Sequence, residues 1–112
     1  MSTELLDDDF LRWFDGIASE DEQGRFRLGK VLATPGAVDA LAESGQSVDE
    51  FMQRHRCGDW GDIGEDDKAE NEYSVDGRLR IFSAYHTTKG EKIWVITEAD
   101  RSSTTVLLPS EY

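Results

Sequence analysis

LRIFSAY (79–85), KIWVIT (92–97) and STTVLL (103–108) are the three runs of this sequence that decide its fold. The first run alternates between two faces, as a half-buried strand does, and the second is apolar on both faces, which predicts a central strand. TKGE (88–91) predicts a hairpin loop, and ADRS (99–102) predicts a turn. Consecutive strands joined by tight turns predict an antiparallel meander.

Helix signals precede this meander. Thr34 suits the N-cap of a helix whose first turn accepts Pro35 and which Gly45 ends. Ser47, followed three residues later by a glutamate, is typical of a capping box and starts a second helix over 48–56. The residues that this helix should bury are Val48, Phe51 and Met52.

The remaining segments complete the predicted domain. Apolar and polar residues alternate over 25–33, which predicts a further strand. The pattern of residues 65–75 predicts a short acidic helix, followed by a turn at 76–77. Between them lies a glycine-punctuated loop, 58–64, which Trp60 and Ile63 should hold against the core. The predicted fold is α+β: an antiparallel β-meander of 3–4 strands with 3–4 short helices packed mainly on one face. A length of 112 residues predicts one domain, 1–112.

Residues 1–24 read as an acidic extension of this domain. Their apolar residues recur at helical spacing, which predicts a helix over 3–18, and 19–24 predicts an acidic loop. The residues that form this apolar face are Leu6, Phe10, Trp13, Phe14 and Ile17.

The net charge of −12 is concentrated in two stretches. Residues 1–24 and residues 59–76 each hold 8 acids and 1 base. Since solubility of a small domain requires a net charge of about 2–8, this excess indicates a binding role. The candidate partner-binding acids are Asp7, Asp8, Asp9, Asp15, Glu20, Asp21 and Glu22 in the first stretch, and Asp59, Asp62, Glu65, Asp66, Asp67, Glu70, Glu72 and Asp76 in the second.

Such a charge disfavours direct binding of nucleic acid or of anionic lipid, and it favours a basic partner. Carboxylates at every second or third helical position approach the spacing of phosphates along one DNA strand, so an imitation of the phosphate backbone is one interpretation. A solvated, salt-adapted surface is another. Divalent-cation binding by residues 59–66 is a third, although these acids lack the spacing of an EF-hand loop.

No motif predicts catalysis, a metal site or a cofactor. His55, Cys57 and Asp59 lie close in sequence, but zinc sites need about four ligands or three plus water. With a single cysteine no intrachain disulfide can form, which fits a reducing cytoplasm. The sequence shows neither the pattern of a signal peptide nor a run long enough to span a membrane. We therefore expect a cytoplasmic, monomeric, non-enzymatic protein without metal or cofactor.

From Phe26 to Tyr112 the chain resembles a family of small proteins carried by plasmids, prophages and other bacterial mobile elements. The residues that carry the resemblance are LG (28–29), ATPGA (33–37), SGQS (44–47), EF (50–51), RH (54–55), GDWGD (58–62), SAY (83–85) and IWVITEADRSSTTVLLP (93–109). This family is mostly of unknown function, so the resemblance implies no catalytic residues. The acidic residues 1–24 depart from its pattern and make the chain similar in type to anti-CRISPR and antirestriction inhibitors, several of which act as DNA mimics.

Together, charge and resemblance predict an inhibitor that blocks DNA binding by a bacterial defence complex, with the type I CRISPR surveillance complex favoured. The expected partner is a basic DNA-binding protein or CRISPR–Cas subunit. Two alternatives stay open: an antirestriction protein, or a mobile-element protein of unrelated binding function whose charge serves solubility.

Overall fold

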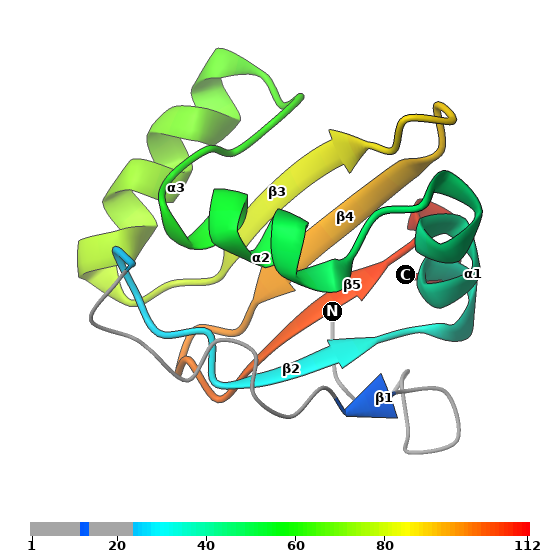
Figure 1. Cartoon of the computed structure of the whole chain (residues 1–112). Helices are drawn as coiled ribbons and strands as arrows, with labels where there is room; N and C mark the ends of the chain where they lie inside the picture. The colour runs from blue at the N-terminus through cyan, green and yellow to red at the C-terminus, as the bar shows by residue number, and fades with distance from the viewer. Residues whose placement is uncertain (1–11, 14–23) are drawn as a thin grey trace.

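The computed structural model describes residues 12–13 and 24–112 of the chain. It is an α+β fold with one mixed sheet of order β1-β2-β5-β4-β3 (Figure 1). The elements in chain order are β1 (Arg12–Trp13), β2 (Lys30–Ala33), α1 (Pro35–Ser44), α2 (Val48–Arg56), α3 (Glu65–Gly77), β3 (Ile81–His86), β4 (Lys92–Thr97), β5 (Ser103–Leu107) and a 3-10 turn (Pro109–Glu111).

The antiparallel meander predicted from the C-terminal runs is confirmed for β3, β4 and β5. β3 pairs antiparallel with β4 from Ile81–Thr97 to His86–Lys92, and β4 pairs antiparallel with β5. β4 lies between its two neighbours, as its apolar character on both faces predicts.

The description of the sheet as an antiparallel meander is only partly right, because β2 joins it parallel to β5. The alternation of side chains along a strand does not show whether it pairs parallel or antiparallel, and residues 34–80 separate β2 from the meander.

The backbone before β2 comes close to the turn before β5: a Cβ added at Gly29, whose φ is +66°, would lie 2.4 Å from the carbonyl oxygen of Arg101. A glycine is therefore required where β2 begins to run beside β5. The strand predicted over 25–33 is correspondingly shorter.

The helix predicted over 3–18 is wrong at Arg12–Trp13, which form β1 and pair antiparallel with β2. The other residues of that prediction lie outside the described residues. The free edge of β2 offers unpaired backbone groups, and pairing with them overrides a local helical pattern.

The predicted boundaries of α1 and α2 are confirmed by their caps, whereas the turn predicted at 76–77 is wrong because α3 includes both residues. The Thr34 side chain accepts a hydrogen bond from the Ala37 amide, and Gly45 ends α1 in the left-handed conformation. The Ser47 hydroxyl accepts from the Glu50 amide at the start of α2. α3 extends two residues beyond its predicted end, and the left-handed residue that caps it is Arg78.

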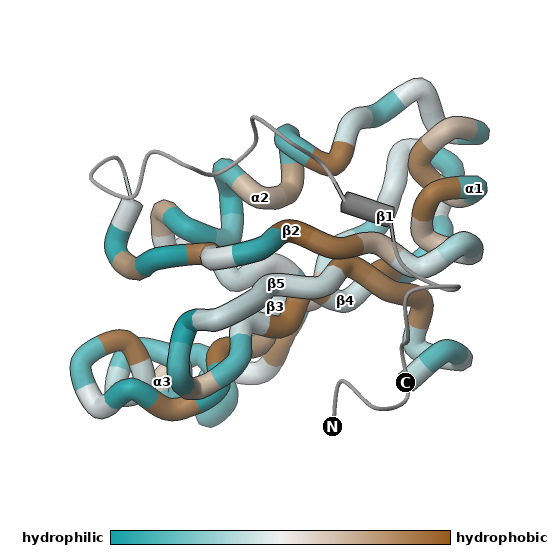
Figure 2. The backbone as a smooth tube through the Cα atoms, turned by 90° about the horizontal axis from the view of Figure 1, so that it is seen from below, coloured by the Kyte–Doolittle hydropathy of each residue, from teal (hydrophilic) through white to brown (hydrophobic). Residues whose placement is uncertain are grey.

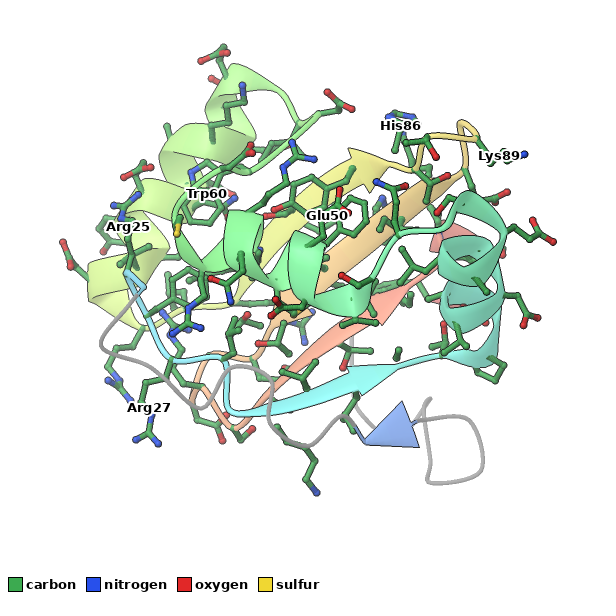
Figure 3. All side chains as sticks on the ribbon, viewed as in Figure 1. Arg25, Arg27, Glu50, Trp60, His86 and Lys89 are labelled. Carbon is green, nitrogen blue, oxygen red and sulfur yellow. The ribbon has the colours of Figure 1, made fainter. Side chains whose placement is uncertain are left out.

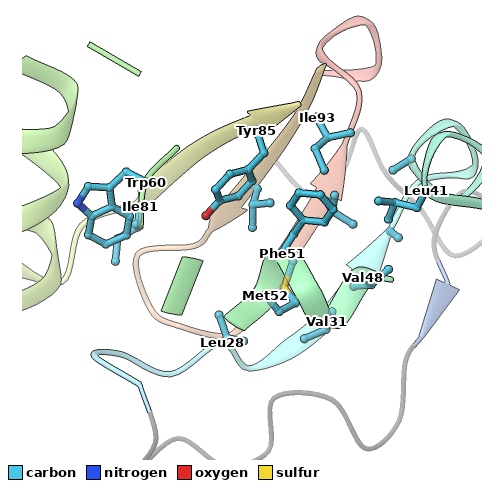
Figure 4. Close-up of a cluster of buried hydrophobic side chains, with 14 of the residues drawn as sticks. Leu28, Val31, Leu41, Val48, Phe51, Met52, Trp60, Ile81, Tyr85 and Ile93 are labelled. Atoms are coloured by element: carbon cyan, nitrogen blue, oxygen red, sulfur yellow. The ribbon is translucent and has the colours of Figure 1, made fainter. Parts of the chain in front are cut away.

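The main hydrophobic core lies between α2 and one face of the sheet (Figure 4). Phe51 and Met52 of α2 are fully buried, and Val48 is 8% exposed. The facing strands contribute Val31, Ile81, Tyr85, Ile93, Val95 and Val106. Hydrophobic stretches run along β2, β4 and α1 in Figure 2. As predicted, Trp60 is buried and Ile63 packs against this core.

α3 lies beside the outer edge of β3 and satisfies its backbone. The Asn71 amide donates to the carbonyl of Phe82 over 2.6 Å and accepts from the Phe82 amide over 3.1 Å. The neighbouring loop bonds both backbone groups of Ala84, through the Trp60 carbonyl and the Asp62 amide. An edge strand that would otherwise be open is thus covered, and this contact fixes where α3 stands.

Candidate functional site

The eight acids of residues 59–76 lie on α3 and on the loop before it, and all are exposed. The structure divides them into carboxylates that have a basic partner within the chain and carboxylates that have none among the described residues. This division decides how much negative charge the surface offers to another molecule.

Glu72 belongs to the partnered group. Its carboxylate accepts two hydrogen bonds from Arg25, over 2.6 and 3.0 Å, and one from the indole of Trp60 over 3.0 Å. The hydrogen bonds from Arg25 and then Trp60 lower the pKa of Glu72 to about 2. Figure 3 shows Arg25 and Trp60 next to each other beside α3. Glu72 therefore ties α3 to the segment before β2.

Asp59, Asp62 and Glu65 also have partners. Asp59 accepts from Arg54 over 2.6 Å, and this hydrogen bond lowers the pKa of Asp59. Asp62 lies 2.8 Å from the imidazole of His86. Glu65 lies 3.6 Å from Lys68. Half of the predicted site residues in this stretch are thus engaged within the chain.

The other four acids form what we call the α3 acidic face: Asp66, Asp67, Glu70 and Asp76. They spread over about half of the helix surface, since Asp67 and Asp76 are nine residues, or about two and a half turns, apart. Among the described residues none forms a hydrogen bond or short ion pair with their carboxylates, although the hydrogen bond with Glu72 and then the charge of Asp76 raise the pKa of Arg25. Asp66 and Glu70 are four residues apart and share one line of the helix, and Tyr73 continues that line. Tyr73 is 71% exposed. Tyr73 was not among the predicted site residues, although its spacing of three from Glu70 places both on one line of a helix.

The seven acids predicted in the N-terminal extension lie outside the described residues. They are Asp7, Asp8, Asp9, Asp15, Glu20, Asp21 and Glu22. Their position relative to the α3 acidic face therefore stays a prediction.

The candidate metal or catalytic group around His55 is not assembled. His55 is fully buried, and its two ring nitrogens lie 2.6 Å from the Ser83 hydroxyl and 2.9 Å from the Thr97 hydroxyl. Burial, and then the charge of Arg101, lower the pKa of His55 to about 3, so the ring is a neutral core group. Cys57 is exposed. Within residues 12–13 and 24–112 no three His, Cys, Asp or Glu side chains are grouped as metal ligands would be.

Charge is also segregated on a larger scale than the sequence analysis recognised. Residues 35–77, which comprise the three helices, hold 12 acids and 3 bases, whereas residues 78–112 hold 4 acids and 5 bases. α1 and the start of α2 contribute four of these acids, and no base occurs between Val31 and Gln53. The absence of bases over this stretch was the signal that could have identified a third acidic region, beside 1–24 and 59–76.

Comparisons with protein-family models, curated proteins and solved structures find no match to this chain. Among the helices of the described residues, none has the length and hydropathy needed to cross a bilayer.

Proposed function

We propose that this protein is an acidic inhibitor that occupies the basic nucleic-acid-binding surface of a bacterial defence complex. The type I CRISPR surveillance complex is the proposed first target, with a restriction complex as the alternative. The observation that carries the proposal is the α3 acidic face: four carboxylates without a hydrogen-bonded partner in the part of the chain that the structure describes, and an exposed tyrosine, on one helix.

The charge density of this face supports the proposal. Asp66 and Asp76 are ten residues apart, which corresponds to about 15 Å of helix rise. Four carboxylates over that length are close to the four or so phosphates of one DNA strand, and well below the roughly nine charges of the duplex. Counted along the helix axis, the α3 acidic face thus carries about the charge of one strand, spread over half of the helix surface. The acids of residues 1–24 are the proposed counterpart of the other strand.

Tyr73 adds a contribution that phosphate lacks. Tyrosine is enriched among the residues that dominate protein–protein binding energies, because it buries a large ring at low conformational cost. An exposed ring in line with Asp66 and Glu70 therefore supports a protein partner whose binding site combines bases with an apolar pocket.

The attachment of α3 also suits this role. Asn71 anchors the helix to β3, and Glu72 ties it to Arg25 and Trp60. A helix held at several points loses little further freedom on binding, which favours affinity.

The test is competition on the purified type I surveillance complex with fluorescent double-stranded target DNA. We expect the full-length chain to displace DNA, and we expect its inhibition to weaken as salt rises. Glu70→Lys should raise the half-inhibitory concentration at least about fivefold, since it reverses a central charge of the face.

Glu91→Lys is the matched control, because Glu91 is another exposed glutamate but lies in the β3–β4 hairpin. It should change inhibition less than about twofold. Simultaneous binding of DNA and inhibitor without interference would contradict the proposal. Equal effects of the two substitutions would instead assign the charge to solubility or to general steering.

A further inference from the structure

An apolar groove of about 330 Å³ lies between α1 and the start of α2. Leu41 and Val48 line its apolar surface, and both belong to the buried core (Figure 4). Val38 and Ala42, one helical turn apart on α1, line it as well. Val38 is half-buried and Ala42 is exposed. The volume is at the lower end of the ~300–1,000 Å³ range of ligand pockets, which is enough for an apolar side chain.

Hydrogen bonds fix the link between the two helices, which borders the groove. The Gln46 side chain accepts from the Thr88 amide over 2.8 Å and donates to Glu50 over 2.8 Å. The Thr88 hydroxyl donates to the Ser44 carbonyl over 3.2 Å. The β3–β4 hairpin thus braces the link between α1 and α2.

The surroundings of the groove are acidic. Asp49 lines it directly, and Asp39 and Glu43 follow Val38 and Ala42 on the adjoining line of α1. All three acids are exposed. Asp49 accepts a hydrogen bond from the Gln53 side chain over 3.2 Å, and among the described residues none of the three is paired with a basic side chain. The nearest basic residue of the bracing hairpin, Lys89, points outward at the tip of the hairpin (Figure 3).

We propose that this groove binds a basic amphipathic helix of a partner protein, with one apolar side chain in the groove and flanking Lys or Arg side chains at Asp39, Glu43 and Asp49. An apolar pocket surrounded by charges of a single sign selects a ligand that is apolar at its centre and oppositely charged at its sides. A neutral apolar ligand would leave the acidic rim unused, and a purely basic ligand would leave the groove unfilled. The inference goes beyond the proposed function, since it uses no residue of the α3 acidic face.

Three synthetic helical peptides of equal length test the inference by fluorescence anisotropy on the full-length protein at about 150 mM salt. The first combines Leu with Lys, the second replaces each Leu by Gln, and the third replaces each Lys by Glu. We expect saturable binding of the Leu/Lys peptide, with NMR amide shifts concentrated over residues 38–49. The other two peptides should bind at least about tenfold more weakly, since each loses one of the two complementary features.

Two matched substitutions locate the site. Ala42→Arg fills the groove and adds a positive charge to it, whereas Ala69→Arg makes the same change at an exposed alanine of α3. Ala42→Arg should weaken binding of the Leu/Lys peptide at least about tenfold, and Ala69→Arg less than about twofold. A second pair of variants tests the charges alone. The double variant Asp39→Asn/Glu43→Gln leaves the groove open and should weaken binding of the Leu/Lys peptide about fivefold. The control double variant on α3, Asp67→Asn/Glu70→Gln, should change it little.

Three results would overturn the inference: no saturable binding of the Leu/Lys peptide, equal binding of the Gln/Lys peptide, or equal effects of the two arginine substitutions. DNA competition by the Ala42→Arg protein separates the two proposals. If inhibition survives while peptide binding is lost, the groove and the α3 acidic face act independently.

Discussion

Asn71→Ala should separate α3 from the sheet, and the structure sets the size of the effect. Asn71 is 4% exposed, and its amide exchanges two hydrogen bonds with the backbone of Phe82. Each such bond contributes about 1 kcal/mol net, and a buried backbone group left unpaired costs about 1–3 kcal/mol. Alanine recovers roughly 0.5 kcal/mol of helix propensity. The expected loss in the free energy of unfolding is therefore about 2–3 kcal/mol.

Urea unfolding followed by tryptophan fluorescence measures this loss as a fall in the midpoint of about 1–2 M at an unchanged slope. Glu70→Ala, at the exposed neighbour, is the control and should stay within about 0.5 kcal/mol of the parent protein. Hydrogen exchange of the Phe82 amide should accelerate in Asn71→Ala and not in the control.

Asn71→Asp distinguishes the two bonds. The carboxylate can still accept from the Phe82 amide, but it cannot donate to the Phe82 carbonyl and would face it with negative charge. We expect a loss at least as large as for alanine. A loss below about 0.5 kcal/mol in Asn71→Ala, or unchanged exchange at Phe82, would refute the idea that this residue covers the edge of β3.

Three further predictions concern single residues: His55, Glu72 and Gly29. His55 should stay neutral in an NMR titration down to about pH 4. Its pKa of about 3 in the folded protein is below that in the unfolded chain, so the free energy of unfolding should fall as pH drops from about 6.5 toward 3. Glu72 has a lowered pKa, so its contribution to the free energy of unfolding is present above its unfolded pKa of 4.5 and is lost as pH falls toward 2. Glu72→Gln should therefore reduce the pH dependence of the free energy of unfolding in that window by at most about 1 kcal/mol. Gly29→Ala should lower the free energy of unfolding, measured in urea, by more than about 2 kcal/mol, since the added Cβ would meet the Arg101 carbonyl. Gly45→Ala is the control: its φ is also positive, at +73°, but nothing lies within 4 Å, so the loss should be about 1 kcal/mol.

Local signals predicted much of the fold because their causes are local. Thr34, Ser47 and Gly45 cap helices through bonds that span three or four residues, so their roles were readable from spacing. The exposure of the acids in 59–76 was equally predictable, since charged side chains are almost never buried without a partner.

The candidate site was predictable only as a composition. Nothing in the spacing of Arg25 and Glu72 indicates that they pair across 47 positions, or that Arg54 pairs with Asp59. Together with the contacts of Asp62 with His86 and of Glu65 with Lys68, these pairs engage half of the carboxylates predicted in residues 59–76 and leave the α3 acidic face. The groove between α1 and α2 was likewise invisible, because each helix alone shows only an apolar stripe.

By itself, the sequence determined the α+β class, the three-stranded meander, the limits of α1 and α2 and the excess of acid, because propensity, capping and charge act within a few residues. Only the tertiary structure decided that β2 runs parallel to β5, that Arg12–Trp13 form a strand, and which acids are left unpaired. Those outcomes depend on contacts between segments far apart in the chain. A backbone edge or a guanidinium becomes a partner only once folding brings it within hydrogen-bonding distance.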